Sequence, residues 1–175
     1  MFSIRPATLN DVSLLKRLIH ELAEYEREPN AIAITEDDLL RDGFGPEPKF
    51  RAILAEDADS GQPVGYAVFF PCYSTWTGPG MFLEDLFVRV PFRGRGVGKA
   101  LLAEVARIAR QEGCRSIRLD VLHWNEPAIR FYKSLGADYF DDWRNVVIRE
   151  EALDRLARSP RPPLRWRSTT SRESS

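Results

Sequence analysis

The chain has 175 residues, 43% of them hydrophobic and 29% charged, and a formal net charge of −1. This length and composition suit one globular domain with its own core. They exclude a membrane protein, because no stretch approaches the run of about 20 apolar residues that a span needs, and an N-terminus without a basic region followed by an apolar one favours a cytoplasmic location.

Charge is divided unevenly along the chain. From Ser159 on, four arginines and one glutamate give the tail a charge of +3, which leaves −4 on the preceding residues. An acidic body argues against nucleic acid as a partner. The tail is rich in Pro, Ser and Arg, so we predict one folded domain at 1–158 and a disordered basic tail at 159–175, with a small docking segment as the alternative.

Cysteine usage gives no sign of a metal centre or a disulfide framework. Cys72 and Cys114 are far apart in the sequence, no C-x-x-C pair exists, and only two histidines are present. Zinc sites and disulfide-rich domains need closely spaced Cys and His residues. We therefore expect no metal.

The first half of the chain reads as short strands and amphipathic helices. Asn10 or Asp11 can cap the first helix, and Thr35 with Asp38 resembles a capping box at the start of the second. The predicted elements are a strand at 2–5, a helix at 12–26, a helix at 35–40 that ends before Gly43, antiparallel strands at 50–56 and 64–70, and a loop at 71–79.

The stretch from Phe82 to Lys99 is an apolar run that breaks into a basic, glycine-rich turn. Its first half predicts a buried strand that carries Glu84 and Asp85, and consecutive strand residues point to opposite faces. Its second half places glycines between that strand and a helix that ends near Gly113. The free N–H groups and the dipole of such a helix start form an anion site, to which a phosphate can come close.

Two known phosphate-binding templates fail on this turn. A P-loop needs glycine at the position of Arg93 and Ser or Thr at that of Ala100. A dinucleotide fingerprint places its third small residue on Lys99 or Leu101. The pattern that remains is R-x-x-G-x-G from Arg93 to Gly98, and a glycine turn without a ligand is the alternative.

The second half of the chain predicts a parallel crossover. A strand at 116–122 follows the helix, and Asn125 can cap the next helix, which bears Pro127 in its first turn and ends at Gly136. A strand at 143–149 and a short helix at 151–157 follow. The predicted fold is a single α/β (α+β) domain with a mixed, mostly antiparallel sheet, helices on both faces and one parallel strand-helix-strand crossover.

This order of elements, with R-x-x-G-x-G between the fourth strand and the third helix, resembles the Gcn5-related N-acetyltransferase fold across about residues 2 to 150. Several segments are similar to its diamine (spermidine/spermine) and thialysine N-epsilon-acetyltransferase branch. They are Ile4-Arg-Pro-Ala-Thr, Glu21-Leu-Ala-Glu-Tyr-Glu, Asp42-Gly-Phe-Gly, Tyr73-Ser-Thr-Trp, Leu83-Glu-Asp-Leu-Phe-Val and Trp124-Asn-Glu-Pro-Ala-Ile-Arg-Phe-Tyr-Lys. The resemblance implies acetyl-CoA as donor, a primary amine of a small molecule as acceptor, direct transfer in a ternary complex, and a homodimer.

The resemblance also implies roles for individual residues. It gives Glu84 the role of general base and Tyr132 that of general acid. The implied coenzyme-binding residues are Leu86, Phe87, Val88, Arg93, Gly94, Arg95, Gly96, Val97, Gly98, Lys99, Asn125 and Ala128. The implied acceptor-binding residues are Tyr25, Glu26, Glu84, Arg118, Leu119, Asp120 and Trp143.

Residue chemistry supports the acid and base. An alkyl ammonium of pKa about 10.4 must lose a proton before it attacks a thioester, and a buried Glu84 with a raised pKa suits that task. A tyrosine can protonate the leaving thiolate while staying neutral at rest. The structural alternatives are a salt-bridged Glu84, a core Tyr132 and a solvated Glu26.

Other functions stay open at this stage. Members that acetylate polyamines tend to carry an acid where this chain has Ser74, so the sequence favours an amino-acid-like amine such as thialysine or lysine. A protein N-acetyltransferase and a coenzyme A-binding regulator without catalysis are the alternatives, although a regulator has no need of an acid and a base.

Overall fold

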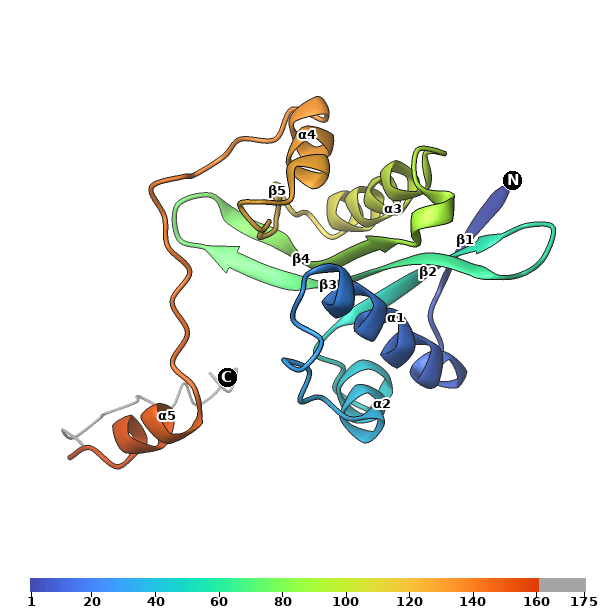
Figure 1. Cartoon of the computed structure of the whole chain (residues 1–175). Helices are drawn as coiled ribbons and strands as arrows, with labels where there is room; N and C mark the ends of the chain where they lie inside the picture. Colours follow the sequence, from blue (N-terminus) through green and yellow to red (C-terminus); the bar gives the residue numbers. More distant parts are fainter. Residues whose placement is uncertain (161–175) are drawn as a thin grey trace, which may run out of the picture. The chain divides into compact units, whose positions relative to one another are not determined.

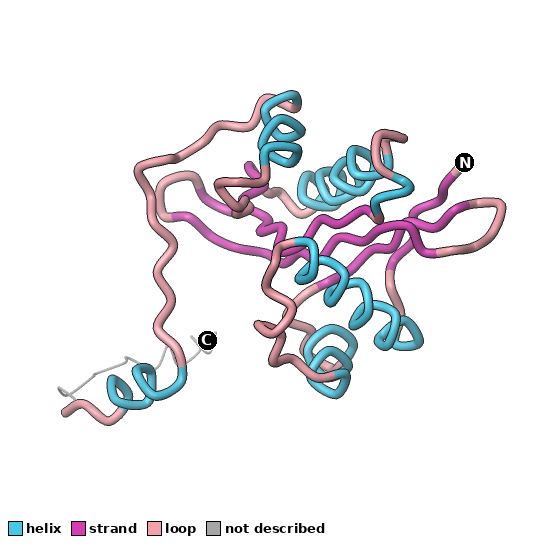
Figure 2. Tube along the Cα trace, in the orientation of Figure 1, coloured by secondary structure: helices cyan, strands magenta, loops and turns pink. Residues whose placement is uncertain are grey.

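The computed structural model describes residues 1–160, which fall into two compact units, Met1–Arg130 and a second that starts at Phe131. The first unit is built on a five-stranded sheet (Figures 1 and 2). In chain order the elements are β1 (Phe2–Pro6), α1 (Val12–Tyr25), α2 (Glu36–Phe44), β2 (Arg51–Asp57), β3 (Pro63–Ser74), β4 (Gly78–Val88), α3 (Val97–Gln111), β5 (Ser116–Arg118), α4 (Glu126–Ser134) and α5 (Glu150–Ala157), with 3-10 turns at Leu9–Asp11 and Val90–Phe92.

The strands lie in the order β1-β2-β3-β4-β5. The first three pairings are antiparallel, and β4 pairs with β5 in parallel after the chain has crossed through α3. A parallel pair requires such a crossover, whereas antiparallel neighbours need only a turn. The predicted mixed sheet with one parallel crossover is therefore confirmed.

Helices cover both faces of this sheet (Figure 1). Strand residues alternate between the faces, so Ile53 and Ala55 pack with α3 while Ala52 and Leu54 pack with α1. Each helix presents one apolar stripe to the sheet. The fully buried α1 residues Leu15 and Leu18 and the α3 residues Leu101 and Val105 belong to these stripes. The expected helices on both faces are confirmed.

Several predicted boundaries need correction. Helix α2 runs through Gly43, because the ring of Phe50 packs where a side chain at this glycine would stand. The expected loop at 71–79 is mostly strand, since residues up to Ser74 pair with residues from Gly78 on and lengthen the β3–β4 hairpin. Strand β5 is shorter than predicted and ends at Arg118.

The predicted strand at 143–149 is wrong. No strand is assigned there, and Val146, Val147 and Ile148 are exposed. The β-branched run gave the prediction, but strand propensity needs a neighbouring strand to which the backbone can bond. The predicted disordered tail lies outside the described residues, apart from Ser159 and Pro160.

Candidate active site

A bulge in β4 places two adjacent carboxylates in different surroundings. Val68 of β3 pairs with Asp85, and the next residue of β3, Phe69, pairs with Leu83, so Glu84 is the additional residue. Leu83 packs on the α3 face, whereas Asp85 lies on the α1 face beside Tyr66. Bulges of this kind re-aim side chains and are frequent next to active sites.

Glu84 is exposed at this bulge. The expectation that it is buried within an apolar strand is therefore wrong, because the bulge interrupts the regular alternation of the strand. Its role as general base remains a prediction. Exposure leaves the carboxylate accessible to water and to a substrate.

Asp85 is the part-buried member of the pair. Its Oδ2 accepts a hydrogen bond from the Tyr66 hydroxyl at 3.0 Å. Burial raises the pKa of Asp85 to about 6, and the nearby charges of Glu84 and Glu26 add to the rise. Burial also raises the pKa of Tyr66 well above 10, so the phenol stays protonated and keeps donating.

The C-terminal end of α1 contributes two of the predicted acceptor-binding residues. Tyr25 is the last residue of the helix and Glu26 caps it. Glu26 is half-buried, and burial raises the pKa of its carboxyl group. Because the charge of Glu26 acts on Asp85, these groups belong to one acidic region on the α1 face of β4.

The glycine turn has the form predicted for an anion site. Gly96 is the N-cap of α3 with φ 84, and no side chain bonds the free N–H groups of the first turn. Gly94 has φ 75, and beyond the adjacent residues of the chain no atom lies within 4 Å of where a Cβ would stand at either glycine. Glycine adopts this backbone at little cost, and the open backbone can receive a phosphate.

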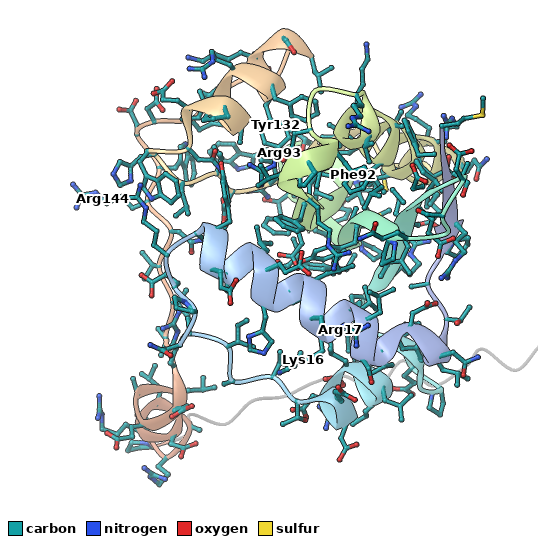
Figure 3. The ribbon with its side chains drawn as sticks, turned by 45° about the vertical axis from the view of Figure 1, so that its right-hand side comes forward. Lys16, Arg17, Phe92, Arg93, Tyr132 and Arg144 are labelled. Carbon is teal, nitrogen blue, oxygen red and sulfur yellow. The ribbon has the colours of Figure 1, made fainter. Side chains whose placement is uncertain are left out.

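Two basic side chains of the turn have contacts of their own. Arg93 Nε donates to the carbonyl oxygen of Val88 at 2.8 Å, and its guanidinium lies 4.3 Å from the centroid of the Tyr25 ring. Arg95 lies 5.4 Å from the ring centroid of Phe92. Phe92 and Arg93 are labelled in the turn that precedes α3 (Figure 3). Arg93 thus contacts the end of β4 and the end of α1.

The expected coenzyme strand has an open edge. Pairing between β4 and β5 ends at Phe82 and Arg118, so it does not reach Leu86, Phe87 or Val88. These residues still pair with β3 on the other side. Backbone groups along such an edge can bond a ligand with amide groups.

Asn125 caps α4, as its position in the sequence predicts. Its Oδ1 accepts from the Ala128 N–H at 3.3 Å and from the Tyr25 hydroxyl at 3.1 Å. Asn125 is 9% exposed, so its amide group is shielded from bulk water and depends on these hydrogen bonds. The proposed coenzyme contacts of Asn125 and Ala128 remain predictions.

The remaining predicted residues occupy several positions. Arg118 ends β5, Leu119 packs against the core on the α3 face, and Asp120 is exposed in the following loop. Tyr132 and Trp143 lie in the second unit. Tyr132 is buried on α4, and burial raises its pKa to about 12, whereas Trp143 is 69% exposed.

The sequence analysis gave no role to Asp85 or to Tyr66. A signal for both was present, since an acid in one apolar strand and a tyrosine in the neighbouring apolar strand each need a buried partner. What the sequence could not supply was the bulge that brings Asp85 to the face of Tyr66. Among residues 1–160, no group of three or more His, Cys, Asp or Glu side chains is arranged to hold a metal ion.

Comparisons with known proteins agree on the class. Residues 15–137 match the Acetyltransferase (GNAT) family. The chain is 39% identical over 163 residues to thialysine N-epsilon-acetyltransferase of Sus scrofa, covering 88% of this chain and 96% of the relative. It is 38% identical over 162 residues to spermidine/spermine N(1)-acetyltransferase-like protein 1 of Homo sapiens, covering 87% of this chain and 23% of that protein.

A solved structure gives the same fold. An integron cassette protein from the mobile metagenome of V. cholerae superposes with a TM-score of 0.72 at 26% identity, covering 90% of this chain and 98% of that one. The chain therefore belongs to the Gcn5-related N-acetyltransferase family, and it is an N-acetyltransferase. The predicted family and branch are confirmed.

Proposed function

We propose that this enzyme transfers the acetyl group of acetyl-CoA to the terminal primary amine of a small amino acid such as thialysine or lysine, with diamines and polyamines as weaker acceptors. The observation that carries the acceptor class is the acidic region around Asp85, whose pKa is raised by burial and also by the charges of Glu84 and Glu26. A region of this charge attracts an ammonium group. The thialysine and spermidine/spermine relatives support the same class.

The coenzyme site fits a pyrophosphate at the start of α3. The uncapped N–H groups after Gly96 and the positive charges of Arg93, Arg95 and Lys99 would hold that group. The open edge of Leu86–Val88 would bond the amide-containing arm of the coenzyme, and Asn125 and Ala128 would flank it. Bound there, acetyl-CoA supplies the thioester whose acetyl group is transferred.

The chain's own side chains supply the proton transfers. Deprotonating an alkyl ammonium at pH 7 costs about 4 to 5 kcal/mol, from a pKa of about 10.4. Exposed Glu84 takes the first proton of the ammonium directly or through water. As the tetrahedral intermediate collapses to the amide, the leaving sulfur receives a hydrogen bond from Tyr132 and takes up the second amine proton, so coenzyme A leaves as the free thiol. N–H groups of Leu86–Val88 stabilise the oxyanion. The amine attacks the thioester directly in a ternary complex, so no nucleophilic side chain of the enzyme takes part.

A panel of acceptors tests this function. Thiol release from acetyl-CoA should be seen with thialysine or lysine, more weakly with polyamines, and least with peptides. Activity on peptides alone would favour a protein N-acetyltransferase. If acetyl-CoA raises the melting temperature while no amine releases thiol, the chain is a coenzyme-binding regulator.

Ser74 is where acceptor choice can be changed without disturbing the hairpin. Its Oγ accepts from the N–H groups of Trp76 and Thr77 at 3.2 and 3.3 Å, and an aspartate can accept the same bonds. We expect Ser74→Asp to raise kcat/KM for spermidine relative to thialysine by about fivefold, from one added charge interaction. Ser74→Asn is the neutral control of equal shape. Equal preferences in the two variants would show that an acid at this position does not select polyamines.

We propose a homodimer as the assembled form. Apolar side chains in the second unit support it, because exposed apolar groups of this number mark interaction surfaces. They are Phe140, Val146, Val147, Ile148, Leu153 and Leu156. Light scattering should give twice the chain mass of 20.0 kDa, and Val147→Asp should give the single mass. An unchanged mass in that variant, with Asp142→Asn as the control, would place the interface elsewhere.

We also propose a cytoplasmic enzyme whose acetyltransferase domain is residues 1–158, without nucleic-acid or membrane partners. The charge of −4 on the residues before the tail supports the first exclusion. No helix within residues 1–160 is long and apolar enough to cross a membrane.

A further inference from the structure

The end of α1 is joined to the start of α4 by contacts that the roles proposed above do not use. The Tyr25 hydroxyl donates to Oδ1 of Asn125 at 3.1 Å. The Tyr25 and Trp124 rings meet in a tilted arrangement with centroids 6.2 Å apart, and the Arg27 guanidinium lies 4.6 Å from the Trp124 ring centroid. All these residues belong to the first unit.

The backbone at the end of α1 is left-handed at Arg27, the residue that contacts Trp124. The N–H of Glu28 bonds to the carbonyl of Ala23, and the N–H of Arg27 bonds to that of Glu24, which is the pattern of a Schellman cap. Arg27 occupies its left-handed position with φ 66, where glycine is the usual residue. A side chain retained at this unfavourable backbone position has a compensating contact, here with Trp124.

Asn125 receives two hydrogen bonds on one oxygen. Besides the Tyr25 hydroxyl, its Oδ1 accepts the Ala128 N–H, and the Asn125 carbonyl accepts the Ile129 N–H at 2.9 Å. The orientation of this side chain therefore fixes the first turn of α4. The ring of Tyr25 is held separately by Arg93 and Trp124, so the hydroxyl is the part that acts on Asn125.

We propose that Tyr25 is a positioning residue, whose hydroxyl orients the Asn125 cap and so fixes the first turn of the helix that carries Tyr132. Its kinetic consequence rests on the proposed acetyl transfer, but its structural consequence does not. The hydroxyl of Tyr25 thus serves α4, while its ring packs against Arg93 and Trp124. A turn that is fixed before substrate binds has less freedom to lose during catalysis.

The test combines four variants with two measurements. The variants are Tyr25→Phe, Asn125→Ala, their double, and Asn125→Asp, which keeps an oxygen that can accept both bonds. The first measurement is steady-state kinetics with the best amine of the acceptor panel. The second is hydrogen exchange by mass spectrometry over residues 125–134, with residues 100–110 of α3 as the internal reference.

We expect Tyr25→Phe to lower kcat about tenfold, the loss of one well-placed hydrogen bond, with less than about twofold change in the KM for the amine. Exchange over 125–134 should accelerate while that of α3 does not. The double variant should be no slower than Asn125→Ala, and Asn125→Asp, which keeps the acceptor oxygen, should leave the exchange over 125–134 near that of wild type.

Three results would overturn the proposal. They are unchanged exchange over 125–134 in Tyr25→Phe, multiplicative effects on kcat in the double variant, and a change confined to the KM for the amine, which would mean that the hydroxyl contacts the acceptor directly. If no amine proves active, the proposed function fails, and the exchange measurement alone decides whether Tyr25 positions α4.

Discussion

Replacing Tyr132 by phenylalanine is expected to lower kcat by about a hundredfold or more while the dissociation constant for acetyl-CoA changes by less than about twofold. The substitution removes only the hydroxyl from a buried side chain that is 9% exposed. The ring keeps its packing against Phe131, with centroids 5.1 Å apart. Steady-state kinetics and calorimetric titration with the coenzyme measure the two quantities separately.

The pKa of Tyr132 indicates how its hydroxyl acts on the leaving thiolate. Burial raises the pKa of Tyr132 to about 12, so it is protonated throughout the working range of pH. A free thiol has a pKa of about 8.5, so complete proton transfer to an exposed thiolate would be unfavourable. The hydroxyl instead donates a hydrogen bond as the thiolate develops, and buried surroundings raise the pKa of that thiolate too.

Tyr139→Phe is the matched control, since it removes a hydroxyl from another tyrosine of the second unit. It should leave kcat within about twofold of wild type. A Tyr132→Phe enzyme that turns over normally but binds acetyl-CoA weakly would contradict the role of hydrogen-bond donor to the leaving sulfur and would make Tyr132 a coenzyme-binding residue.

Local signals in the sequence predicted most of the fold. The capping box at Thr35 and Asp38 forms as expected, with the Thr35 side chain accepting from the Asp38 N–H. Gly96 begins α3 in the left-handed backbone that glycine favours. These features depend on a few neighbouring residues, so they can be predicted from the sequence.

Features that depend on partners distant in the sequence were not predictable in the same way. The bulge at Glu84 is a mismatch between β3 and β4, and it decides which carboxylate is exposed. The position of Arg93 over Tyr25 joins a turn to a helix end that lies far from it in the chain. The run at 143–149 has strand-forming residues but no assigned strand, because pairing is a property of two segments.

Substitutions at Glu84 and at Asp85 should have different effects on the pH dependence of activity. Glu84→Gln is expected to lower kcat/KM by about a hundredfold and to flatten the acid side of its pH profile, because the base that must be ionised is gone. Asp85→Asn keeps an oxygen for the Tyr66 hydroxyl and removes only the charge. It should raise the KM for the amine and leave the acid side of the profile in place.

The pH dependence of the free energy of unfolding tests the raised pKa of Asp85 independently of the kinetics. Its pKa in the folded chain is raised from 3.8 to about 6, so between these values the folded state binds more protons than the unfolded one. The free energy of unfolding therefore falls as pH rises through this window, by about 3 kcal/mol for about two units. Urea unfolding at pH 4 and pH 8 should show this fall in wild type and a smaller one in Asp85→Asn.

The same pair of variants decides which carboxylate is the base. An exposed Glu84 is accessible to water, whereas Asp85 must stay bonded to Tyr66 to be tolerated inside the sheet. The acid limb should consequently follow Glu84, while the pH dependence of stability follows Asp85. If the acid limb disappears in Asp85→Asn and survives in Glu84→Gln, the buried carboxylate is the base, and Glu84 serves to bind the ammonium.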